Sequence, residues 1–121
     1  MIDHLALGVS DLAASRAFYE SALAPLGFGV VMEWEGRVAF GPTARPIFFI
    51  GRREPVQTGL HIAFQAADRD RVDAFHEAAL AAGGSDNGSP GMRTQYHPHY
   101  YGAFVLDPDG NNAEAVCHTP Q

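Results

Sequence analysis

Residues 4–27 read HLALGVSDLAASRAFYESALAPLG, and residues 61–84 read HIAFQAADRDRVDAFHEAALAAGG. The two stretches align without a gap at an offset of 57 residues, and ten of the 24 positions are identical. Alanine supplies four of the ten matches, but histidine, aspartate, phenylalanine, glutamate and glycine also match. Similarity at a fixed offset indicates a duplicated structural unit.

Each copy reads as a strand followed by a helix. Short apolar runs predict strands over residues 2–9 and 59–66. An aspartate that can cap a helix precedes an apolar stripe in both copies, which predicts helices over residues 11–23 and 68–82. Glycine follows each helix and is expected to end it.

The rest of each half is predicted to be strands and turns. The expected strands cover residues 28–34, 37–41, 46–51, 100–106 and 112–118. The sequence DPDGN at 107–111 is a strong turn signal, residues 85–91 are polar and predicted to be a loop, and a short strand near 93–96 is left open. Residues 52–58 would link the two modules, which cover about 1–55 and 59–118. The fold class is therefore α+β, a single domain over 1–121 built from two βαβββ modules, with the helices on one side of curved sheets.

The amino-acid composition excludes several classes of function. The chain has 121 residues, 46% of them hydrophobic, and a formal net charge of −6. All eight cations are arginine, so lysine Schiff-base chemistry is excluded. Net acidity argues against nucleic-acid partners and anionic membranes, and no apolar run approaches the length of a membrane helix. Cys117 is the only cysteine, no basic leader opens the chain, and we therefore expect a cytoplasmic protein without disulfides.

Strand alternation predicts that two histidines lie on the strand face opposite the helix. Because successive strand residues point to opposite faces, His4 and His61 would point away from the apolar face that receives the helix. Glu114 lies in the last predicted strand among small and apolar residues, where a carboxylate needs a partner or a metal. Two imidazoles and a carboxylate form a ligand set for a divalent ion. The alternative is structural, with hydrogen-bonded or exposed histidines and a solvent-facing glutamate.

The sequence resembles the vicinal oxygen chelate superfamily, which includes glyoxalase I, extradiol dioxygenases and bleomycin-resistance proteins. The resemblance rests on DHL at 3–5, VSD at 9–11, FY at 18–19, GLHIA at 59–63 and FVLDPDGNNAE at 104–114. It implies paired βαβββ modules whose mixed sheets curl around a concave, metal-centred cavity, with the helices on the outer face. It also implies that the metal ligands are His4, His61 and Glu114, with Glu114 as the catalytic residue.

The fourth ligand of glyoxalase I, a glutamate, falls on Phe48 in this sequence. A glyoxalase I reaction is therefore not expected, and the remaining His-His-Glu set is more similar to that of the dioxygenases. The metal could be iron, manganese, zinc or nickel.

An unusual aromatic stretch, YHPHYY at residues 96–101, lies beside the expected cavity strand. Its histidines and phenols could bind a substrate or supply an acid–base group, or they could be packing residues. The residues expected to line the substrate pocket are Phe48, His97, His99, Tyr101 and Phe104.

The leading hypothesis is a metal-dependent enzyme of the lyase or dioxygenase branch, acting on a small molecule that chelates the ion through neighbouring oxygens. The alternative is a metal-free, drug-sequestering protein of the bleomycin-resistance type. A homodimer is expected, because open sheets leave strand edges that a second copy can cover. Whether the modules pair within one chain or between two is left open.

Overall fold

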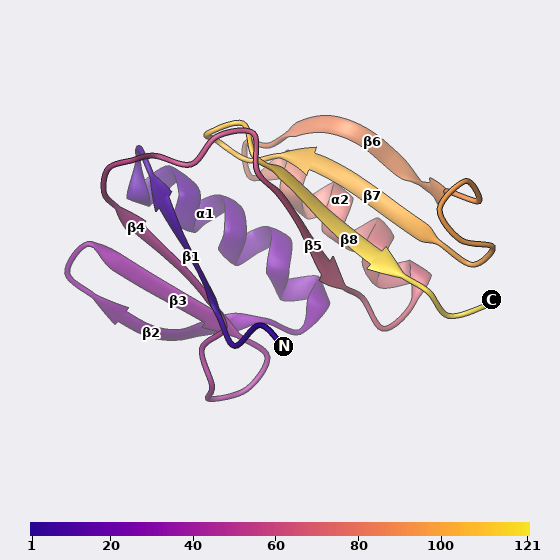
Figure 1. Ribbon diagram of the computed structural model, residues 1–121, viewed down its shortest axis with the longest axis horizontal. Helices are drawn as coiled ribbons and strands as arrows, with labels where there is room; N and C mark the ends of the chain where they lie inside the picture. The colour runs from indigo at the N-terminus through magenta and orange to yellow at the C-terminus, as the bar shows by residue number, and fades with distance from the viewer.

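The computed structural model describes residues 1–121 and contains two helices and eight strands in two sheets (Figure 1). The first module consists of β1 (Leu5–Val9), α1 (Leu12–Leu23), a short 3-10 turn (Ala24–Leu26), β2 (Gly29–Trp34), β3 (Arg37–Gly41) and β4 (Phe48–Arg52). The second consists of β5 (His61–Gln65), α2 (Arg69–Ala81), β6 (Ser85–Met92), β7 (Tyr101–Leu106) and β8 (Asn112–Cys117). Neither helix has the length and apolar character needed to cross a bilayer.

The two sheets have the same topology. Their strand orders are β1-β4-β3-β2 and β5-β8-β7-β6, with the first pair parallel and the other two antiparallel in each. No strand pair joins the sheets, and they do not close into a barrel. The predicted α+β class and the duplicated βαβββ unit are therefore confirmed.

Both helices begin where the sequence predicts a cap. The side chain of Asp11 accepts a hydrogen bond from the Ala14 amide at 3.1 Å, and that of Asp68 accepts one from the Arg71 amide at 2.9 Å. These carboxylates satisfy amides that have no partner within the first turn of a helix. After the first helix Gly27 adopts a φ of 89°, a left-handed conformation that glycine reaches without strain.

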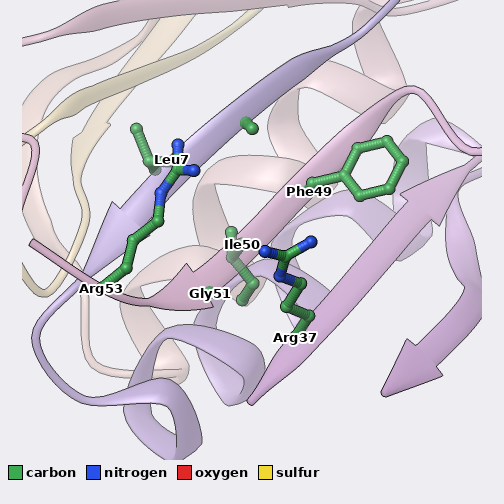
Figure 2. Close-up of a pocket in the computed structure, with 7 residues that line it drawn as sticks. Leu7, Arg37, Phe49, Ile50, Gly51 and Arg53 are labelled. Carbon is green, nitrogen blue, oxygen red and sulfur yellow. The ribbon is translucent and has the colours of Figure 1, made fainter. Parts of the chain in front are cut away.

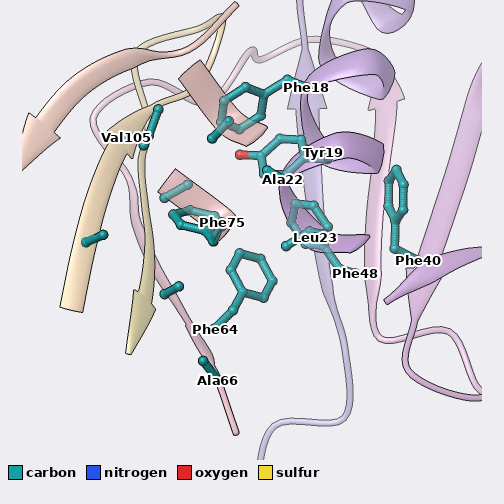
Figure 3. Close-up of a cluster of buried hydrophobic side chains, with 14 of the residues drawn as sticks. Phe18, Tyr19, Ala22, Leu23, Phe40, Phe48, Phe64, Ala66, Phe75 and Val105 are labelled. Carbon is teal, nitrogen blue, oxygen red and sulfur yellow. The ribbon is translucent and has the colours of Figure 1, made fainter. Parts of the chain in front are cut away.

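One hydrophobic core of 20 buried residues lies between the sheets and the helices (Figure 3). Leu7 and Val9 of β1 are buried in it, as strand alternation predicted. The core is continuous between the modules, because the ring centroid of Phe48 in β4 lies 5.5 Å from that of Phe64 in β5. The two modules therefore pack against each other within one chain.

The DPDGN turn fastens the second module to the first. Asp107 accepts a hydrogen bond from the buried Tyr19 hydroxyl of α1 at 2.6 Å. Asp109 accepts one from the Ser10 amide at 3.1 Å, and the Asn111 side chain donates to the Gln57 carbonyl at 2.9 Å. The turn thus contacts α1, the end of β1 and the linker between modules.

The prediction of a loop over 85–91 was wrong, since these residues form β6. The strand pairs with β7 through two register irregularities, one on each side of Gly88. β6 is the outer edge of its sheet, where polar residues and bulges are tolerated, so its sequence lacks the apolar alternation of a half-buried strand. No strand forms at 93–96.

The strands β1 and β5 are the edges at which the two sheets face each other, and they run in roughly opposite directions (Figure 1). The start of β1 consequently does not lie beside the start of β5 (Figure 1). This arrangement decides which of the candidate ligands can meet.

Candidate functional site

His61 and Glu114 form the centre of the candidate site. His61 opens β5, and Glu114 lies in the neighbouring strand β8. The Nε2 atom of His61 and the Oε1 atom of Glu114 are 2.7 Å apart. The Glu114 side chain is 1% exposed, whereas the His61 side chain is 55% exposed, so the pair presents an imidazole to solvent above a buried carboxylate.

Tyr100 holds the second oxygen of this carboxylate by donating its hydroxyl hydrogen to Oε2. Gly102 makes room for the contact, because a Cβ there would lie 3.1 Å from Cε1 of Tyr100 and 3.2 Å from Oε2 of Glu114. Burial first, and then the hydrogen bond and charge of Glu114, raise the pKa of Tyr100 above its ordinary value. Tyr100 therefore remains a hydrogen-bond donor at neutral pH.

These three residues open into a hollow that is completed by Tyr96 and Phe104. Its volume is about 470 Å³, within the range of roughly 300–1,000 Å³ typical of small-molecule sites. The Phe104 ring centroid lies 6.2 Å from that of His61, so the two rings are neighbours in the hollow. The hollow thus combines an imidazole–carboxylate pair with aromatic walls.

His4 does not reach this hollow. It directly precedes β1, where its Nδ1 atom lies 2.8 Å from Oδ1 of Asp3 and its ring centroid lies 5.3 Å from that of Phe49. The chain contains no cluster of three histidine, cysteine, aspartate or glutamate residues that could hold a metal ion. One chain therefore brings together two of the three candidate ligands, and His4 lies outside the hollow.

Phe49, and not Phe48, is the counterpart of Glu114 in the first module. Ala6 pairs with Phe49 in the first sheet, and its repeat equivalent Ala63 pairs with Glu114 in the second. Phe48 points to the opposite face and is 2% exposed in the core, so it does not line a pocket. The assignment from sequence was displaced by one residue, which reverses the face of a strand.

Three further pocket candidates lie outside the hollow. His97 and His99 belong to the turn before β7, where the His99 amide donates to Nδ1 of His97 at 3.0 Å. Tyr101 faces α2, and its hydroxyl donates to Oδ1 of Asp73 at 2.6 Å. Tyr101 and Phe104 are three residues apart in the same strand and therefore point to opposite faces, so only one of them can face the hollow.

Sequence reasoning missed Tyr96 and Tyr100 as individual members of the site. The aromatic stretch at 96–101 was a signal, but which two of its phenols line the hollow is set by the turn geometry of residues 93–100. This turn is closed by a hydrogen bond from the Arg93 amide to the Tyr100 carbonyl at 2.8 Å. Alternation along β7 does not extend through such a turn.

The geometry of His61 and Glu114 fits two adjacent positions around one divalent ion. With metal bonds of about 2.1 Å, adjacent ligand atoms lie about 3 Å apart around an octahedral ion and about 3.4 Å apart around a tetrahedral one. A bound ion would therefore replace the 2.7 Å hydrogen bond between Nε2 and Oε1 and move the two atoms slightly apart. Tyr100 would act as a supporting partner that orients the carboxylate. A third protein ligand would have to come from outside this chain's hollow.

The duplicated sheets and their open arrangement agree with a comparison to known families. The family model of the Glyoxalase/Bleomycin resistance protein/Dioxygenase superfamily matches residues 1–115. The chain belongs to this superfamily. A crystal structure of a glyoxalase/bleomycin resistance protein from Albidiferax ferrireducens T118 is 31% identical, with a TM-score of 0.82 and 98% of each chain covered.

Two other proteins are similar to this superfamily member. A glyoxalase-related enzyme from Fulvimarina pelagi shares the fold, with a TM-score of 0.73, 20% identity, and coverage of 97% of this chain and 87% of that one. The Bacillus subtilis protein YqjT, whose name describes it as uncharacterized, is 29% identical over 131 residues, covering 94% of this chain and 96% of YqjT.

Proposed function

We propose that this superfamily member is a metal-dependent enzyme acting on a small substrate that chelates a divalent ion through neighbouring oxygens. The observation that carries the proposal is the contact between the half-exposed imidazole of His61 and the fully buried carboxylate of Glu114. Burying a carboxylate in an apolar strand costs free energy unless hydrogen bonds, an opposite charge or a metal ion compensate it. The pair has the donor types that suit iron, manganese, zinc or nickel.

His4 of a second copy would complete the ligand set. His4 and His61 are equivalent in the repeat: His4 directly precedes the edge strand β1, and His61 opens the edge strand β5. In a symmetric dimer the first module of one copy can face the second module of the other, and two equivalent sites result. This arrangement supports the expected homodimer, because a single chain leaves His4 and the His61–Glu114 pair apart.

The bound ion would polarise substrate oxygens and stabilise the negative charge that develops on them. His61 would hold the ion through Nε2, and Glu114 through Oε1. Tyr100 would keep Oε2 hydrogen-bonded, which fixes the orientation of the carboxylate. Tyr96 and Phe104 would shield one side of the substrate from water. Phe49 replaces a second carboxylate, so the proposal favours chemistry that needs one acidic ligand, in the lyase or dioxygenase branch.

A metal-free binding protein is the second candidate function. It is favoured by the contacts of Glu114 alone, since both carboxylate oxygens already have hydrogen-bond partners within the chain. In that case the aromatic walls would sequester an apolar molecule, and His61 would only satisfy the buried charge.

Metal content separates the two functions. Protein reconstituted separately with iron, manganese, zinc and nickel is analysed for bound metal after gel filtration, in the wild type, His61→Ala, Glu114→Gln and His76→Gln. His76 contacts Asp86 instead of the hollow, so its variant is the matched control. We expect one ion per chain in the wild type and the control, and none in the other two variants. Absence of bound metal in the wild type under all four conditions would support the binding protein.

A further inference from the structure

Arg37 and Arg53 are unpaired cations on the outer face of the first sheet, the face turned away from the helices. Three of the other arginines have carboxylate partners: Arg16 contacts Glu33 at 2.7 Å, Arg45 contacts Asp3 at 2.7 Å, and Arg71 contacts Asp68 at 2.5 Å. The remaining three, Arg52, Arg69 and Arg93, have none. Arg37 and Arg53 make no ion pair within the chain, although both line one hollow (Figure 2). Two unpaired guanidinium groups beside one hollow form a local positive site on a protein of net charge −6.

Two glycines allow both side chains to lie over the sheet. Gly51 of β4 is opposite Arg37 in the register, and a Cβ on Gly51 would lie 3.3 Å from Cγ of Arg37. Gly8 of β1 lies beneath the linker, since a Cβ there would lie 2.5 Å from the Pro55 carbonyl oxygen and 3.1 Å from that of Arg53. The absence of side chains at these two positions lets Arg37 cross β4 and lets the linker carry Arg53 over β1.

The linker that carries Arg53 is fixed to β1. The Gln57 amide donates to the Gly8 carbonyl at 3.0 Å, and the Gln57 side chain accepts from the Gly8 amide. Arg53 therefore projects from a backbone that is tied down on both sides, by β4 before it and by Gln57 after it.

An aromatic surface adjoins the two guanidinium groups. The rings of Trp34 and Phe49 are stacked, with centroids 6.0 Å apart and an interplanar angle of 17°. Trp34 pairs with Arg37 across β2 and β3, so the two residues share the outer face. Trp34 is 44% exposed, an unusual exposure for the only tryptophan of the chain. Phe49 lines the same hollow as both arginines.

We propose that this face binds a small organic anion, with its oxyanion held by Arg37 and Arg53 and a planar apolar group against Phe49 and Trp34. Guanidinium groups bind carboxylates and phosphates through paired hydrogen bonds, and aromatic surfaces receive planar groups. The inference rests on the proposed function, because that function makes this face a wall of the substrate cavity, and it names the substrate class as an aromatic carboxylate or aryl phosphate.

The fluorescence of Trp34 reports on binding directly, since no other tryptophan contributes. Benzoate, phenyl phosphate and the neutral analogue benzamide are titrated into chelator-treated and metal-loaded protein. We expect saturable quenching by at least one of the two anions and none by benzamide at the same concentrations. The preferred anion identifies the carboxylate or the phosphate as the ligand. Equal responses to benzamide and to both anions, or no response to any of them, would overturn the proposal.

Matched variants separate a built site from a general effect of charge. Arg37→Gln and Arg53→Gln are each expected to weaken anion binding by about tenfold, the loss typical of one charged hydrogen bond. Arg71→Gln removes the same charge on α2 and should leave the affinity unchanged; circular dichroism checks that all three fold. A uniform weakening in the three variants would overturn the proposal, as would unchanged affinity in the first two.

The two proposals fail separately. Anion binding without metal retention would overturn the metal chemistry alone. Metal retention without anion binding would overturn the organic-anion site alone. If Arg37→Gln and Arg53→Gln instead change only the sedimentation of the protein, the two arginines contact a second copy, and the anion site is overturned.

Discussion

Glu114 depends on two neighbours that come from different parts of the second module. His61 opens β5, whereas Tyr100 precedes β7, and their contacts satisfy both oxygens of a carboxylate with no exposed surface. Each of the three residues therefore affects the properties of the other two, and single substitutions can reveal the coupling.

Glu114→Gln should lower the pKa of Tyr100. The negative charge of Glu114 disfavours the phenolate, so its removal moves the pKa of Tyr100 down towards 10.0, while burial keeps it above that value. Phenolate absorbance in a pH titration, with Tyr100→Phe used to assign the signal, provides the measurement. An unchanged titration of Tyr100 would show that the carboxylate does not contact it in solution.

Tyr100→Phe should destabilise the protein, because it leaves one buried oxygen of Glu114 without a donor. The expected loss in the free energy of unfolding is about 1–3 kcal/mol. Tyr96→Phe is the control, since Tyr96 is 63% exposed and lies in the same hollow. Denaturant unfolding compares the two variants, and equal stabilities would contradict the role given to Tyr100.

At the scale of single residues, strand alternation predicted the face of His61, and its apolar surroundings singled out Glu114 as a carboxylate that needs a partner. The structure places both residues in one hollow with Phe104. The prediction failed for Phe48, where the strand is a nearly continuous apolar run, PIFFI at 46–50, that does not indicate which residues face the core. The faces of Phe48 and Phe49 follow from the register with β1, which is a tertiary property.

At the scale of the elements, the DPDGN turn connects β7 to β8 and also holds the second module against the first. It accepts the Tyr19 hydroxyl of α1 through Asp107 and the Ser10 amide through Asp109. A turn motif is readable from sequence, but its partners 88 and 99 residues away are not.

Tyr19→Phe should cost about 1–3 kcal/mol of unfolding free energy near neutral pH, because Asp107 loses a buried donor. It should also reduce the loss of stability in alkali. Burial first, and then Asp107, raise the pKa of Tyr19 above its ordinary 10.0, so its stabilisation is complete below pH 10 and falls as the pH rises further. Urea unfolding at pH 7 to 11 tests both statements. An alkaline slope as steep in the variant as in the wild type would contradict the second.

Gly8→Ala should displace the linker from β1, since the new Cβ would lie 2.5 Å from the Pro55 carbonyl oxygen. We expect a loss of about 1–3 kcal/mol in the free energy of unfolding. Gly29→Ala is the control, because a Cβ at Gly29 meets no atom within 4 Å. Thermal unfolding compares the variants, and a Gly8→Ala protein as stable as Gly29→Ala would show that the linker does not rest on β1.

Helices and most strands were predictable because caps, glycine stops and apolar alternation are local signals. Asp11 and Asp68 cap the two helices as expected. β6 was not predictable, because SDNGSPGM at 85–92 is held as an edge strand by β7 and not by its own propensity. Strand pairing overrides local composition there.

For the whole molecule, the modules pack through their helices and leave His4 apart from His61 and Glu114. The repeat predicted equivalent histidines, but equivalent positions in two modules do not have to lie close together. Completion of the site by a second copy is thus the central claim of the proposed function.

Mixing two inactive variants tests this claim directly. His4→Ala and His61→Ala are each purified, mixed in equal amounts under conditions of subunit exchange, and analysed for bound metal, with heterodimers verified by native mass spectrometry. Each variant alone is expected to retain no metal. If His4 acts on the His61–Glu114 pair of the other copy, random exchange restores one intact site in every heterodimer, about one quarter of the wild-type metal content. A mixture that forms heterodimers and still retains no metal would contradict the shared site.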